Sequence, residues 1–185
     1  MKTFPGRVAI GVMAIVFAGS GAAWAQGLRP PKADVVLLTA VDAVRAGESV
    51  RVAIQVTLPE GLHVNANQPR DPSLIPVVLT VESPAGVSVD EIAYPMPTDL
   101  VQQGAELPLA VYERRFTIGV GLDIAGSVAS GEITVPARLR YQACDDKICY
   151  VPGTVATGWT LRVVPPGTAV TAQNLAGDFP GLAGQ

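Results

Sequence analysis

A strict alternation of apolar and polar residues constrains this chain more than any other feature. Residues 48–57, ESVRVAIQVT, place an apolar side chain at every second position from Val50 to Val56. Residues 131–142, GEITVPARLRYQ, repeat the pattern from Ile133 onward. Because successive side chains of a strand point to opposite faces, this period of two predicts β-strands with one buried face.

Shorter stretches with strand composition account for much of the remaining chain, and turn residues such as those of LPEG and SPAG separate them. They span residues 33–41, 62–66, 76–82, 87–94, 111–120 and 157–164. No stretch shows the spacing of an amphipathic helix. A succession of short antiparallel strands without helices predicts an all-β, immunoglobulin-like antiparallel β-sandwich.

The first 25 residues are typical of a secretory signal peptide. Lys2 and Arg7 precede an uninterrupted apolar run, residues 8–18, and small residues lead to a cut after Ala25. The apolar run is shorter than the roughly 20 residues that cross a bilayer. We therefore expect residues 1–25 to be cleaved and the rest to be exported to the periplasm, with no direct membrane insertion after cleavage.

Cleavage would leave one domain, residues 26–164, and a tail, residues 165–185, whose Pro, Gly and Ala content predicts poor order. Loss of Lys2 and Arg7 moves the formal net charge from −3 to −5. A mildly acidic domain has no electrostatic reason to bind nucleic acid. An exported chain meets an oxidising compartment, in which two cysteines can form a disulfide.

Both cysteines lie in residues 141–152, YQACDDKICYVP, and a turn of four residues separates Cys144 from Cys149. A disulfide that closes so short a loop stabilises a fold by only about 2 kcal/mol in the chain-entropy model. A zinc site needs four ligands, whereas the chain has two Cys and one His, and His63 lies far off in sequence. Copper(I) bound by the two thiolates remains an alternative.

An exposed, local and weakly stabilising disulfide also suits thiol–disulfide exchange. The pair lacks the C-x-x-C spacing of thioredoxin, and Asp145 and Asp146 disfavour a thiolate, which Lys147 offsets in part. We therefore expect the bond to react as the target of a partner's thiolate. The alternative from another class is a non-catalytic immunoglobulin-like binding module with an inert structural disulfide.

The residues resemble the N-terminal periplasmic domain of the thiol:disulfide interchange protein DsbD, over roughly residues 33–164. The resemblance is carried by GLHVNANQPRDPSLIP (61–76), YPMP (94–97), VYERRF (111–116) and above all YQACDDKICYVP. It implies an immunoglobulin-like fold and a catalytic, redox-active pair, Cys144 and Cys149. Cys149 would form the mixed disulfide with partners, and Cys144 would resolve it. No cofactor and no metal is implied.

The resemblance also implies partners. A membrane-embedded thiol reductase of the DsbD or CcdA type would supply electrons, thioredoxin-like periplasmic proteins would receive them, and cytochrome c biogenesis is a process that such a relay serves. Because the chain has no transmembrane part of its own, we expect the donor to be a separate protein. The direction of electron flow is left open by the residues themselves.

Four residues are expected to shield the disulfide or to pack around it: Tyr141, Tyr150, Leu100 and Val101. In the family a cap loop with aromatic and acidic residues covers the bond, and residues 98–112 are the matching stretch. That stretch has no aromatic residue before Tyr112. His63 has two interpretations, as a group that tunes a thiol and, the commoner case, as a structural residue at the end of a strand.

Overall fold

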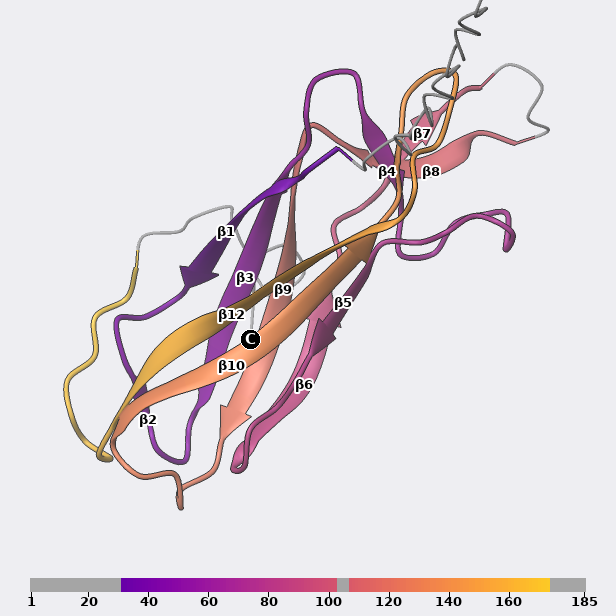
Figure 1. The fold of residues 1–185 in the computed structure, drawn as a ribbon. Coiled ribbons are helices and arrows are strands. Elements are labelled where there is room, and N and C mark those ends of the chain that lie inside the picture. Colours follow the sequence, from indigo (N-terminus) through magenta and orange to yellow (C-terminus); the bar gives the residue numbers. More distant parts are fainter. Residues whose placement is uncertain (1–30, 103–106, 174–185) are drawn as a thin grey trace, which may run out of the picture.

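The structure, a computed structural model, describes residues 31–102 and 107–173. The described residues form strands and no helix, arranged in three four-stranded sheets (Figure 1). This architecture confirms the all-β, immunoglobulin-like prediction. The expected signal peptide, residues 1–25, lies outside the described residues. No helix of the described part is long and apolar enough to cross a membrane.

The first sheet has the order β1-β3-β9-β6 and is antiparallel throughout. Its strands are β1 (Asp34–Thr39), β3 (Ser49–Thr57), β9 (Arg115–Ile124) and β6 (Val87–Ala93). The long central pair β3–β9 runs in register from Ser49 opposite Asp123 to Thr57 opposite Arg115. The alternation predicted for β3 is present, since Val50, Val52, Ile54 and Val56 are all buried.

The second sheet has the order β2-β12-β10-β5. Its strands are β2 (Val44–Arg45), β12 (Gly153–Val164), β10 (Gly131–Tyr141) and β5 (Val78–Val81). All its pairs are antiparallel except β2–β12, which is parallel. The strands β10 and β12 pair along the full length of β10 and form a long two-stranded ribbon. The cysteine turn lies between the end of β10 and the start of β12.

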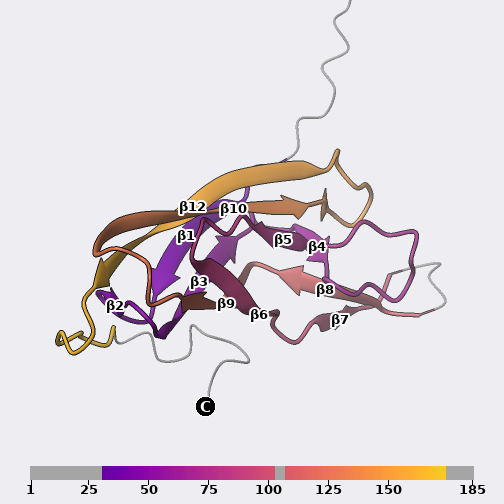
Figure 2. The same ribbon diagram turned by 90° about the horizontal axis from the view of Figure 1, so that it is seen from below.

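The two large sheets pack face to face, and Figure 2 shows β10 and β12 in a layer above β3 and β9. Trp159 of β12 is 1% exposed and occupies the space between the layers. Its indole Nε1 donates a hydrogen bond of 3.0 Å to the carbonyl of Ala53 in the opposite sheet. One side chain therefore contributes both apolar burial and a directional link between the layers.

A third, smaller sheet lies at one end of the sandwich, where Figure 1 shows β4, β8 and β7 together. Its order is β11-β4-β8-β7, and every pair is antiparallel. The strands are β11 (Ala143–Cys144), β4 (His63–Asn65), β8 (Leu109–Glu113) and β7 (Thr98–Leu100). We call it the small sheet; Cys144 ends its strand β11, and Cys149 pairs with Cys144 just beyond that strand.

The expected strand 111–120 is wrong as a single element, because the chain forms β8 and β9 on either side of Arg114. Arg114 has a φ of 53°, the left-handed region that side chains other than Gly rarely adopt, and its carbonyl accepts a hydrogen bond from Leu58 N. This kink lets one stretch of sequence serve two sheets. Alternation alone does not reveal it, since only β9 is apolar at alternate positions, whereas β8 is a short continuous apolar run.

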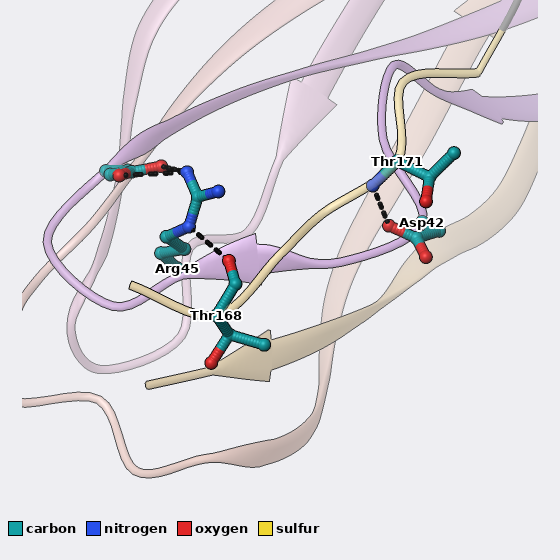
Figure 3. Close-up of polar contacts among 5 residues, drawn as sticks. Asp42, Arg45, Thr168 and Thr171 are labelled. Atoms are coloured by element: carbon teal, nitrogen blue, oxygen red, sulfur yellow. Dashed lines mark hydrogen bonds and ion pairs between the residues drawn. The ribbon is translucent and has the colours of Figure 1, made fainter. Parts of the chain in front are cut away.

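Residues 165–173, the first part of the stretch expected to be poorly ordered, are held at the other end of the sandwich. Thr171 exchanges hydrogen bonds with Asp42: its N–H donates to Oδ1 at 2.7 Å, and its carbonyl accepts from Asp42 N at 3.0 Å. Arg45 Nε donates to the Thr168 carbonyl at 2.6 Å (Figure 3). These contacts connect the segment to residues 42–45, and the poor order expected of residues 165–185 stays a prediction. Residues 174–185 lie outside the described residues.

The Trp159 hydrogen bond yields a stability prediction. Replacing Trp159 by Phe keeps an aromatic ring between the sheets but removes the donor to Ala53, which leaves a buried carbonyl without that partner. We expect the free energy of unfolding to fall by about 1–3 kcal/mol. Urea denaturation of the oxidised protein measures this, with Thr160→Val on the exposed face of the same strand as the matched control. Equal losses in both variants would contradict the assigned role.

Candidate functional site: the disulfide at the edge of the small sheet

Cys144 and Cys149 are joined by a disulfide across a tight turn. Cys144 ends β11, and the two residues face each other in an antiparallel bridge with their Cα atoms 4.0 Å apart. The sulfur atoms are 2.02 Å apart. Within the described residues no group of three or more His, Cys, Asp and Glu side chains is arranged to hold a metal ion.

The two half-cystines differ sharply in exposure. Cys144 is 2% exposed, whereas Cys149 is among the exposed residues of the chain. A thiolate from another protein can reach only a sulfur that meets solvent, so attack at Cys149 is sterically favoured. Cys144 is the less accessible of the two sulfurs.

Asp145 organises the turn between the cysteines. Its Oδ1 accepts hydrogen bonds from Lys147 N at 2.7 Å and from Ile148 N at 2.8 Å. These bonds, that of Ile148 first, lower the pKa of the Asp145 carboxyl below its ordinary value. A carboxylate beside the cysteines therefore stays charged, in line with the expectation that the turn disfavours a thiolate.

Tyr150 packs against the core from the far side of the turn. Its hydroxyl donates to Asp145 Oδ2 at 3.1 Å, and Gln142 Nε2 donates to its carbonyl at 2.9 Å. Tyr141 is buried in the core, and its hydroxyl accepts a hydrogen bond from Ala33 N and donates one to the Pro31 carbonyl. Tyr150 thus braces the turn, whereas Tyr141 anchors the start of the described chain.

The two faces of the small sheet have different surroundings. Ala143, Val64 and Tyr112 are directly opposite one another on β11, β4 and β8, and all three belong to the hydrophobic core. The neighbouring row on the same strands is Cys144, His63 and Glu113. Since successive side chains alternate, this row lies on the opposite face of the small sheet, where Cys144 and His63 are buried and Glu113 is exposed. We call that side the pocket face.

An open pocket of about 560 Å³ lies over the pocket face. Its walls include His63, Glu113 and Leu100, together with other residues of the neighbouring loops: Glu60, Gly61, Leu62, Val101, Gln102, Arg114 and Asp146. Three carboxylates and one guanidinium leave the pocket acidic. The pocket thus meets both the small sheet and the cysteine turn.

His63 is the notable residue of this face, because it lies directly opposite Cys144. It is only 6% exposed, and burial lowers its pKa below the ordinary value of 6.5, although the charges of Glu113 and Asp145 act to raise it. The ring is therefore neutral at pH 7. The structure brings together a histidine and a cysteine that are 81 residues apart in the sequence.

Leu100 and Val101, two of the residues expected to shield the disulfide, line the same pocket. Leu100 is half-buried at the end of β7, and Val101 is 83% exposed. Arg70 holds the two ends of this stretch together, because it bonds Asp99 and the carbonyl of Pro108, each at 2.5 Å. Residues 103–106, within the expected cap, lie outside the described residues. Shielding of the bond by Leu100 and Val101 stays a prediction.

A family model described as the N-terminal part of the thiol:disulfide interchange protein DsbD matches residues 34–158. The match spans most of both large sheets, the small sheet and the cysteine turn. The chain belongs to the DsbD N-terminal family. The predicted resemblance is thereby confirmed, and the family connects the disulfide with thiol–disulfide interchange. A comparison with curated protein sequences finds no match.

Solved structures similar to this DsbD-family chain include the reduced N-terminal domain of Neisseria meningitidis DsbD. It is 15% identical, with a TM-score of 0.41, and the alignment covers 75% of this chain and 88% of that one. The N-terminal periplasmic domain of ScsB from Proteus mirabilis is 14% identical, with a TM-score of 0.47 and coverages of 70% and 46%. A complex between the DsbD N-terminal and the PilB N-terminal domains from Neisseria meningitidis is 15% identical, with a TM-score of 0.39, and the alignment covers 66% of this chain and 80% of that one.

Glu113 and Arg70 are site residues that the sequence analysis missed. Glu113 precedes the kink at Arg114, and its place opposite His63 depends on how β4 and β8 pair. Arg70 lies in a loop and acts on a segment about 30 residues further along the chain. The motif GLHVNANQPR contains both His63 and Arg70, so the sequence marked this stretch. It did not show which residues these two side chains contact.

The titration of His63 yields a prediction on stability. In the folded protein the pKa of His63 lies below 6.5, its ordinary value, which applies to the unfolded chain. Between the folded and the unfolded pKa, the unfolded chain therefore binds more protons than the folded protein. The free energy of unfolding should therefore fall as the pH drops below 6.5 and reach its plateau above it. Denaturation from pH 5 to 8 measures this. His63 is the only histidine of the chain, so His63→Gln should flatten the curve near pH 6; an unchanged slope would contradict a buried neutral imidazole.

Proposed function

We propose that this protein is a periplasmic thiol–disulfide exchange relay that works through the Cys144–Cys149 pair. The observation that carries the proposal is the asymmetry of the bond, with an exposed Cys149 and a Cys144 that is 2% exposed. Membership of a thiol:disulfide interchange family supports it. A disulfide within a six-residue turn contributes little to the fold, so a structural role explains it poorly.

The relay has two steps, each an exchange of sulfur partners. A thiolate of one protein attacks Cys149 Sγ, the S–S bond breaks, and Cys144 leaves with the electron pair. A second thiol of that protein then attacks the mixed disulfide and frees Cys149, so the pair is reduced and the partner oxidised. The reverse sequence passes the two electrons on to the next protein.

The partners in this proposal are of two kinds. A membrane-embedded thiol reductase of the DsbD or CcdA type supplies electrons, and thioredoxin-like periplasmic proteins accept them. Membership of a thiol:disulfide interchange family supports exchange with thiol proteins in general, and the exposed Cys149 gives either partner a sulfur to reach. No cofactor takes part, because thiols and disulfides carry the electron pairs themselves.

Single-cysteine variants test the division of roles. Cys144→Ser leaves only the exposed Cys149, and Cys149→Ser leaves only the buried Cys144. The probe is a thioredoxin-like protein whose resolving cysteine is removed and whose attacking cysteine is activated with thionitrobenzoate. We expect Cys144→Ser to form the mixed disulfide at least about tenfold faster, since thiol access limits exchange.

Release of thionitrobenzoate and a covalent adduct on a non-reducing gel report the reaction, and circular dichroism confirms that both variants are folded. Equal rates would contradict the assignment of Cys149 as the sulfur that meets partners. No adduct from either folded variant would instead favour the binding-module alternative with an inert disulfide.

A further inference from the structure

One row of side chains runs straight across the small sheet and its turn. Cys149 faces Cys144, Cys144 faces His63, and His63 faces Glu113, each pair directly opposite across antiparallel backbone. Directly opposite residues have Cβ atoms about 4.5–5.5 Å apart and point to the same face. His63 is thus the neighbour of Cys144 and is one position further from Cys149.

Cys144 can react in exchange only if its thiol loses a proton. To attack a mixed disulfide its thiol must lose a proton, and burial disfavours the charged sulfur that results. At 2% exposure, solvent has little access for removing that proton. The nearby Asp145 carboxylate disfavours the thiolate further. An exchange reaction at Cys144 therefore needs a proton acceptor within the fold.

His63 has the properties of that acceptor. Its ring is neutral near pH 7 because burial lowers its pKa, and the described residues include no hydrogen bond that occupies a ring nitrogen. Once protonated, the imidazolium is stabilised by the carboxylates of Glu113 and Asp145, both of which act to raise the His63 pKa. The other charged groups of the pocket are Glu60, Arg114 and Asp146.

We propose that His63 takes the proton of the Cys144 thiol during exchange and returns it in the reverse step, and that Glu113 is the residue that positions the charged imidazole. The inference rests on the proposed function. It adds a proton-transfer group to a pair of cysteines that otherwise lies among acidic side chains.

In the mixed disulfide, Cys149 is bonded to a partner sulfur and Cys144 is a thiol. Cys144 passes its proton to His63 and attacks Cys149 Sγ, so the Cys144–Cys149 bond forms and the Cys149–partner bond breaks. The partner sulfur leaves with the electron pair and takes a proton from solvent, the partner having gained two electrons, and the His63 imidazolium releases its proton to solvent. In the reverse step His63 first takes a proton from solvent, Cys144 leaves as a thiolate, and the imidazolium protonates it.

Ellman's reagent separates the two chemical steps without any protein partner. Excess reagent reacts with the reduced protein, and the exposed Cys149 releases the first thionitrobenzoate in a phase that depends on reagent concentration. Cys144 then resolves the mixed disulfide and releases the second in a concentration-independent phase. We expect His63→Gln to slow the second phase at least about tenfold at pH 7 and to leave the first unchanged.

The pH profile of the second phase distinguishes proton transfer from a structural role. With His63 present, the rate should rise with the neutral imidazole and level off above about pH 6.5. In His63→Gln it should keep rising about tenfold per pH unit, as the Cys144 thiol ionises without help. Coinciding normalised profiles would overturn the proposal, since a residue that only packs would change stability and not this shape.

Glu113→Gln tests the positioning residue and provides a second variant at an exposed site. We expect it to slow the second phase several-fold, whereas Glu91→Gln, an exposed carboxylate of β6 in the first sheet, should have no effect. Equal rates in the two Gln variants would remove Glu113 from the proposal.

Chemical rescue provides the last test. The pocket opens onto His63, so His63→Ala should leave a space that imidazole can enter from solution. Added imidazole should restore the second phase in His63→Ala and should not affect the original protein. Two normal phases in His63→Gln, with no rescue in His63→Ala, would overturn this inference alone. A folded original protein that releases no thionitrobenzoate would overturn the proposed function together with it.

Discussion

The burial of Ala143, Val64 and Tyr112 is the constraint on which the site depends. These three side chains fix the small sheet against the core of the sandwich. A strand has only two faces, so the next residue on each of β11, β4 and β8 must point the other way. That residue is Cys144, His63 or Glu113. A shift of any one of these strands by one position would exchange its core-facing side chain for the one on the pocket face.

The same constraint makes the two sulfurs differ in exposure. Cys144 is buried at the end of β11, and the turn held by Asp145 places the exposed Cys149 opposite it. One sulfur is therefore accessible from solvent and the other is not. A buried sulfur can leave and return without competing reactions, but it depends on the fold for its proton. The disulfide and the histidine therefore belong to one arrangement and not to two separate features.

The sequence predicted the fold well because the sandwich strands follow local rules. The alternation in β3 and β10 is visible over several residues and matches the observed burial. The split at Arg114 and the short strands β2, β7 and β11 were missed, since two- or three-residue strands carry no period and a positive φ at Arg carries no local signal. Tertiary pairing decided them.

In the candidate site, too, some residues could be predicted from the local sequence and others depend on tertiary pairing. Cys144 and Cys149 could be singled out because they are close in sequence and chemically distinctive. His63, 81 residues earlier, was weighed as a thiol-tuning residue, but only the β11–β4 register places it opposite Cys144. Arg70 lay within a motif of the family resemblance, but nothing in the sequence connected Arg70 or Glu113 with the residues that they face. Residues that act through long-range pairing cannot be assigned before the pairing is known.

The reduction potential of the Cys144–Cys149 bond tests the central claim most directly. The purified protein is equilibrated in glutathione or dithiothreitol buffers of defined potential, and the free thiols are counted after alkylation. A redox relay predicts a potential near roughly −200 mV, among the proteins that exchange disulfides. A potential below about −300 mV would contradict the account, because it would mark a structural disulfide that periplasmic partners do not open.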